Sequence, residues 1–238
     1  MHERLIHIRQ RWTALLALGL ASGLCCAFVA VRILYLKQVA FTGFIWNLFL
    51  AWVPLGAALV AYAWRGRRYE IWLVVPACAV VWFLFFPNAP YIVTDFVHLH
   101  PREGVPYWYD LITLMAFALT GLFLGYLSLY LMQEVVRGWL GRAASWMFAL
   151  VMLGLSAFGI YLGRFVRWNS WDALLDPLST LAGAAHIANP VRNPQALAFS
   201  ATFFAFSLVC YLIVYSFTHL HGWIEQAGER RKAGDAAP

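Results

Sequence analysis

The sequence predicts an all-α protein that crosses a membrane as a polytopic transmembrane helical bundle of about six spans. Of its residues, 63% are hydrophobic and only 12% are charged, whereas about 25% are charged in a typical soluble domain. The apolar residues also gather into runs of about 20, the length that an α-helix needs to cross ~30 Å of hydrocarbon. No segment between these runs has the length of a soluble domain, so we exclude the class of soluble globular proteins.

Six apolar runs are candidate spans, and polar or Pro- and Gly-containing segments separate them. They cover residues 12–36, 41–64, 71–86, 111–132, 143–163 and 196–218. The first is longer than the apolar region of a signal peptide, so we expect an uncleaved span. The third is short and either starts at Tyr69 or continues past Pro87. We expect residues 1–221 to form a single transmembrane domain and residues 222–238 to form a polar, disordered cytoplasmic tail.

The net charge of +6 does not indicate a nucleic-acid-binding surface, because the basic residues flank the apolar runs and form no patch among polar positions. Their distribution instead predicts the orientation. The larger set, on one side of the membrane, consists of Arg4, Arg9, Arg11, Arg65, Arg67, Arg68, Arg137, Arg142, Arg230, Arg231 and Lys232. We therefore expect both termini to be cytoplasmic and residues 86–110 and 164–195 to share the extracytoplasmic side.

The segment FPNAPYIVTDFVHLHPREGVPYWYD interrupts the apolar sequence with groups that titrate or form hydrogen bonds. Asn88 is a good N-cap, and we expect a short helix to start there. One face of this helix holds Tyr91, Thr94, Asp95 and His98. Asp95 and His98 are three residues apart and can touch, so they are the candidate catalytic residues, as an acid/base pair. The alternative is a polar face turned to water at the membrane surface.

The segment GIYLGRFVRWNSWD places Arg164 and Arg167 one helical turn apart at the exit of the fifth span. Two guanidinium groups so spaced suit a phosphate or a carboxylate. The alternative is interfacial anchoring, in which arginines reach the surface beside a belt of Trp residues. These arginines lie on the side that should be depleted of positive charge, so we expect a partner, which is Asp95, Asp110, Asp172 or an anionic headgroup. The candidate substrate- or anion-binding residues are Arg164, Arg167, Asn88, Asn169, Tyr91, Asp110 and Asp172.

Two further patterns concern helix packing. After Asp172, a stripe of leucines indicates an interfacial helix that lies on the membrane surface and ends near His186. Three GxxxG spacings favour close helix approach within one bundle. These spacings are Gly19/Gly23, Gly121/Gly125 and Gly159/Gly163.

The sequence lacks a Walker loop, an HExxH motif and a GxSxG motif. Because the spans hold almost no charged residue that could form an ion path, a transporter is the less favoured class. His100 lies on the opposite side of the expected helix from His98, so this spacing does not predict a metal site. No pattern indicates a particular cofactor.

The motifs FPNAPYIVTDFVHL, WYDL and GIYLGRFVRWNSWD resemble a family of bacterial integral membrane proteins catalogued as domain of unknown function 1361. The resemblance extends from about the second span to the sixth. It implies a multi-span protein of a bacterial cytoplasmic membrane, and it supplies no reaction. The residues that match the family motifs are Asn88, Pro90, Tyr91, Asp95, His98, Asp110, Arg164, Arg167, Asn169 and Asp172; His100 does not match.

Two functional classes stay open, and both require the two polar segments to meet at one face of the membrane. As an enzyme, the protein would act on a lipid-linked or other anionic substrate, with Asp95 and His98 exchanging protons and the arginines holding the anion. As a platform, the same cluster would bind a lipid headgroup or a partner protein without chemistry. Membrane lipids are expected partners in either class, nucleic acid is not, and the sequence does not fix the oligomeric state.

Overall fold

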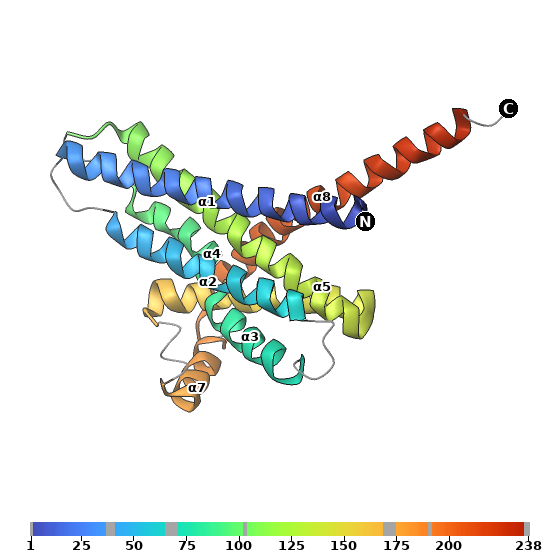
Figure 1. The fold of residues 1–238 in the computed structure, drawn as a ribbon. Coiled ribbons are helices and arrows are strands. Elements are labelled where there is room, and N and C mark those ends of the chain that lie inside the picture. Colours follow the sequence, from blue (N-terminus) through green and yellow to red (C-terminus); the bar gives the residue numbers. More distant parts are fainter. Residues whose placement is uncertain are drawn as a thin grey trace.

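The predicted all-α fold class is confirmed, because the computed structural model is a bundle of helices (Figure 1). It describes residues 2–36, 41–64, 71–101, 104–168, 175–189 and 192–235. In chain order the elements are α1 (His2–Leu36), α2 (Thr42–Trp64), α3 (Ile71–Phe85), α4 (Asn88–Tyr91), the 3₁₀-helix η1 (Ile92–His98), α5 (Tyr107–Tyr161), the π-helical turn η2 (Leu162–Val166), α7 (Pro177–Ile187) and α8 (Pro194–Asp235). α8 stays helical through most of the segment that we expected to be a disordered tail, where Ala, Glu, Gln and Arg favour a helix.

Five helical stretches are long and apolar enough to cross a membrane, and one of them contains two of the predicted spans. This stretch, Tyr107–Val166, has 60 residues, which would extend over about 90 Å if straight, three times a ~30 Å hydrocarbon layer. Its helix breaks at Gly141, where φ is 81° and ψ is −179°. Beyond this residue the chain turns back (Figure 1). We call residues 107–140 the first arm of α5 and residues 142–161 the second arm.

The short third apolar run continues past Pro87, which is one of the two alternatives that the sequence left open. α3 ends at Phe85, and α4 and η1 extend the same apolar stretch to His98. Pro87 and Pro90 lack the N–H groups of a regular helix, which breaks this stretch into short pieces. Asn88 is not the N-cap that we predicted, because Pro87 occupies that position. The Asn88 amide instead donates back to the carbonyl oxygen of Phe85 at 3.2 Å.

Glycines of the first arm let the backbone of α4 approach closely. A Cβ atom at Gly121 would lie 2.7 Å from the carbonyl oxygen of Ala89, and one at Gly125 would lie 2.9 Å from the Ala89 Cβ. The packing role predicted for this GxxxG pair is therefore confirmed. Gly19 and Gly23 differ, because an added Cβ there would meet no atom of the described chain within 4 Å.

One glycine of the second arm and one of η2 contact the same short segment. A Cβ atom at Gly159 would lie 3.5 Å from Pro87, and one at Gly163 would lie 3.3 Å from the ring of Tyr91. The two arms thus enclose residues 87–91. This arrangement requires α5 to fold back, since Gly121 and Gly159 would be about 57 Å apart along a straight helix.

One end of the bundle, which we call the site end, gathers the end of α1, the start of α2, η1, the start of α5 and η2 (Figure 1). The hydroxyl of Tyr109 ties α5 to α1 by donating to the carbonyl oxygen of Phe28 at 2.9 Å. The turn at Gly141 lies at the opposite end. Both polar segments identified in the sequence therefore meet at a single end of the molecule.

Candidate functional site

Arg164 in η2 reaches across the bundle to one face of α4 and η1. Its Nε and Nη2 atoms donate to Thr94 Oγ1 at 2.9 and 2.6 Å, and Nη2 also donates to Asp95 Oδ1. Its Nη1 atom lies 3.2 Å from His98 Nε2. The guanidinium carbon lies 4.5 Å from the centre of the Tyr91 ring. We call these five residues the Arg164 clasp; four of them are the residues that the sequence placed on one helical face.

The 3₁₀ geometry of η1 explains how one arginine contacts all four residues. Side chains three apart eclipse one another in a 3₁₀-helix. Tyr91 therefore aligns with Thr94, and Asp95 aligns with His98, in two adjacent rows. A planar guanidinium with five N–H donors can lie across both rows at once.

Asp95 is the buried acceptor of the clasp. Its side chain is 3% exposed and that of Arg164 is 14% exposed. The second carboxylate oxygen of Asp95 accepts a hydrogen bond of 3.1 Å from the amide of Asn47 in α2. Asp95 therefore joins three elements, η1, α2 and η2. Its charge is balanced by Arg164, which lies 69 residues later in the sequence.

The clasp restricts the acid/base chemistry that the sequence suggested for Asp95 and His98. Arginine has no acceptor atom, so His98 Nε2 must accept the hydrogen bond from Arg164. The imidazole proton then resides on Nδ1, and the Nε2 lone pair is not available to a substrate. Both oxygens of Asp95 are already hydrogen-bonded. As arranged, the clasp can orient groups and balance charge.

Asp110 pairs with neither of the two arginines that the sequence suggested, Arg164 and Arg167. It forms a two-point ion pair with Arg32 of α1, at 2.8 Å for Nε–Oδ1 and 3.2 Å for Nη2–Oδ2. Both side chains are buried, at 1% and 3% exposure. We did not single out Arg32 as a site residue, although a charge at the end of an apolar span normally requires a partner.

Arg167 takes no part in the described contacts of the clasp. Arg167 follows η2 in the left-handed conformation, with φ 63° and ψ 34°, and ends the helix. Its backbone N–H donates to the carbonyl oxygen of Leu162, while its side chain is exposed. Asn169 and Asp172 lie outside the described residues.

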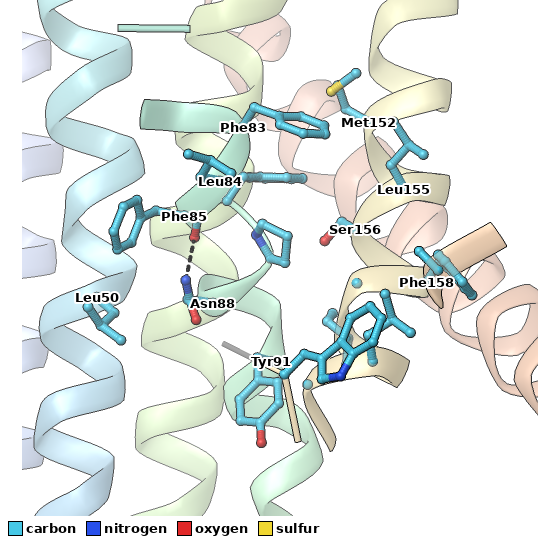
Figure 2. Close-up of a pocket in the computed structure, with 18 of the residues that line it drawn as sticks. Leu50, Phe83, Leu84, Phe85, Asn88, Tyr91, Met152, Leu155, Ser156 and Phe158 are labelled. Atoms are coloured by element: carbon cyan, nitrogen blue, oxygen red, sulfur yellow. Dashed lines mark hydrogen bonds between the residues drawn. The ribbon is translucent and has the colours of Figure 1, made fainter. Parts of the chain in front are cut away.

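A pocket of about 440 Å³ lies beside the clasp, between α2, α3, α4, the second arm of α5 and α7. Tyr91 and Asn47 belong to both the clasp region and the pocket wall. Figure 2 shows Phe83 and Met152 at one end of the pocket, Tyr91 at the other, and Ser156 between them. Asn88, predicted as a binding residue, also lines this pocket.

Ser156 is a buried polar group in the pocket wall. The residue is 4% exposed, and its Oγ atom has no hydrogen-bond partner in the described part of the chain. In Figure 2 this oxygen points away from the α5 ribbon, toward the side on which Phe85 and Asn88 lie. A buried hydroxyl normally has a partner, so this atom marks a position where a ligand group could bind. No pattern in the sequence predicted this position.

α7 covers one side of the pocket, which Thr180 and Ala184 line. Asp176 caps its first turn by accepting from the backbone N–H of Ser179, and hydrogen bonds from the side chain and the backbone of Ser179 lower the pKa of the Asp176 carboxyl. A Cβ atom at Gly183 would lie 2.5 Å from the ring of Trp168, so the helix lies directly on this indole. Leu178 and Leu181 remain exposed, which is the apolar face predicted for an interfacial helix.

Among the described residues, no group of three or more His, Cys, Asp or Glu side chains could hold a metal ion. The geometry thus presents two features at the site end, a clasp with balanced charge and an apolar pocket. Comparison with known proteins gives one match, in which the model of a protein family of unknown function, DUF1361, covers residues 46–215. No curated protein and no solved structure matches the chain.

Proposed function

We propose that this chain is an integral membrane protein that binds a membrane lipid in the pocket beside the Arg164 clasp. The chain belongs to the DUF1361 family, whose description assigns no reaction, so the proposal is drawn from the geometry. In this proposal the clasp is structural and holds η2 against α4 and η1. The observation that carries the proposal is the apolar pocket with an unpartnered buried hydroxyl in its wall.

The dimensions of the pocket suit one lipid chain. Its volume of about 440 Å³ lies in the range of about 300–1,000 Å³ that is usual for small-molecule sites. Along the second arm of α5 and η2 its lining runs from Met152 to Gly163, a rise of about 16 Å. This is close to half of a ~30 Å hydrocarbon layer, the depth of one leaflet.

The pocket also opens toward the side of the bundle. Trp46, Phe83 and Leu155 line it and are each about half exposed. In a membrane these side chains face hydrocarbon, so a lipid can enter without leaving the bilayer. The enzyme class is less well supported, because Asp95 and His98 use their acceptor atoms within the protein.

The proposal is tested by filling the pocket with a large side chain placed on α7, where a substitution should disturb the packing least. Ala184 lines the pocket from α7, a helix with no buried residue, and Ala185 beside it is exposed. We expect Ala184→Trp to lose the lipids that co-purify with the wild-type protein, whereas Ala185→Trp keeps them. Mass spectrometry of lipids extracted from protein in mild detergent measures this. A lipid profile that is the same in all three proteins would refute lipid binding in this pocket.

We further infer that the site end faces away from the cytoplasm, in a bacterial cytoplasmic membrane. Arg137 and Arg142 flank the turn at the opposite end, and cytoplasmic ends are enriched in such residues. Arg32 and Arg164 at the site end are each paired with an aspartate, so they add little net charge there. A carboxy-terminal alkaline phosphatase fusion should be inactive; an active fusion would reverse the orientation.

A further inference from the structure

The chemistry of the pocket identifies the class of lipid, an inference that rests on the proposed function. We infer that the ligand is a lipid with an uncharged, hydrogen-bonding head that carries hydroxyl groups, in the manner of a monoacylglycerol. This differs from the anionic ligand that the sequence suggested.

The first argument is electrostatic. None of the described residues that line the pocket is charged. Arg164, which directly follows the lining residue Gly163 in the sequence, already binds Asp95, Thr94 and His98. A phosphate in the pocket would be desolvated without a counter-charge, which is strongly unfavourable. To reach Arg164 it would have to displace Asp95 and leave that buried carboxylate with Asn47 alone.

The second argument is that the pocket offers neutral hydrogen-bonding groups at the correct depth for a lipid. Tyr91 and Trp168 line its outer end, and neither the phenol hydroxyl nor the indole N–H has a hydrogen-bond partner within the described residues. In Figure 2 the Tyr91 hydroxyl points away from Ser156 and from the apolar end of the pocket. Tyr and Trp favour the membrane interface because one part of each ring system is apolar and another is polar.

Ser156 supplies the deeper polar group. It lies seven residues before Gly163, about 10 Å further into the membrane, and its Oγ atom is unpartnered. Beyond it the lining is apolar, with Met152, Leu155 and Phe83. The order from the site end is therefore a hydrogen-bonding rim, one buried hydroxyl and then an apolar wall, which matches a head, a linking group and a single hydrocarbon chain.

The test compares two ligands that differ by one phosphate group. The full-length protein in detergent is titrated with 1-oleoylglycerol and with 1-oleoylglycerol 3-phosphate, and binding is measured by native mass spectrometry. We expect the uncharged lipid to bind at least about tenfold more tightly. Tyr91→Phe keeps the ring beneath Arg164 and removes only the hydroxyl, so it should weaken binding about 2- to 10-fold. Tyr35→Phe, at an exposed tyrosine outside the pocket, should leave it unchanged.

The other outcomes separate the inference from the proposed function. If the phosphate-bearing lipid binds as tightly or more tightly, and Ala184→Trp abolishes that binding, the inference is wrong and lipid binding stands. If both ligands bind equally and Tyr91→Phe has no effect, the pocket holds only the chain, and the inference is again wrong. If neither ligand binds the wild type more tightly than Ala184→Trp, the proposed function itself fails.

Discussion

Removing one partner of the Arg164 clasp should cost far more than removing both charges. Arg164→Met leaves the Asp95 carboxylate, which is 3% exposed, with only the Asn47 amide. Asp95→Leu leaves a guanidinium that still donates to Thr94 and His98. Breaking a buried ion pair by deleting one charge costs about 3–5 kcal/mol. We expect about 3 kcal/mol for Arg164→Met, because Arg164 is 14% exposed and the site retains some access to solvent.

The double variant distinguishes a charge effect from a loss of packing. An apolar pair of similar volume is often neutral relative to a buried ion pair, so Asp95→Leu/Arg164→Met should be more stable than Arg164→Met alone. Arg164→Lys keeps the charge but loses the planar fork and the Nε–H bond to Thr94. It should therefore cost about 1–2 kcal/mol.

The free energy of unfolding is measured for these variants by SDS titration in mixed micelles, with lipid content recorded in parallel. A double variant whose loss equals the sum of the two single losses would show that Asp95 and Arg164 act independently. An Arg164→Met loss below about 0.5 kcal/mol would show that the pair does not hold the site end together. Either result would refute the structural role that we assign to the clasp.

Two further predictions concern the packing around the pocket. Gly121→Ala should destabilise the protein by about 1–3 kcal/mol, since the new Cβ would lie 2.7 Å from the carbonyl oxygen of Ala89. The control is Gly138→Ala, because nothing lies within 4 Å of a Cβ added there. This variant should be neutral or slightly stabilising in the same SDS titration. Ser156→Ala removes a hydroxyl that has no partner in the described structure, so thermal unfolding in detergent should occur at the same or a higher temperature. Ser128→Ala deletes the acceptor of the Trp82 indole N–H and should cost about 1–3 kcal/mol of stability. Equal effects of the two alanine substitutions in either pair would contradict the packing described here.

The sequence predicts the local part of the site well, because that part depends on short-range geometry. Helical spacing alone placed Tyr91, Thr94, Asp95 and His98 on one face, and this face binds Arg164. We expected the two polar segments on the same side of the membrane because of the number of predicted spans between them. Even the GxxxG pairs of the two arms identified real close contacts.

The remaining features depend on packing between distant helices, which a single sequence does not specify. The sequence suggested Arg164 and Arg167 as possible partners of Asp110, and only the approach of α1 to α5 selects Arg32. The pocket depends on the break in the third span and on the fold of α5 at Gly141. The role of Ser156 follows only from the absence of a neighbour for its Oγ atom in the described structure.

In the orientation that we propose, the two ion pairs explain how Arg32 and Arg164 are accommodated at an end that the charge bias should deplete. Arg32 stacks on Phe41 at 4.3 Å, and Phe41 lies 4.8 Å from Phe44. The Phe44 ring in turn lies 6.4 Å from that of His98 in the clasp. Two phenyl rings thus connect one neutralised arginine to the other.

The two ion pairs and the Asn47 hydrogen bond link α1 to the first arm of α5, and η1 to α2 and η2, without adding net positive charge. The same arrangement disfavours an anion. Any phosphate that recruited Arg164 would have to break the contact that positions Tyr91 and the pocket wall. The pair that fixes the geometry of the pocket therefore also selects an uncharged occupant.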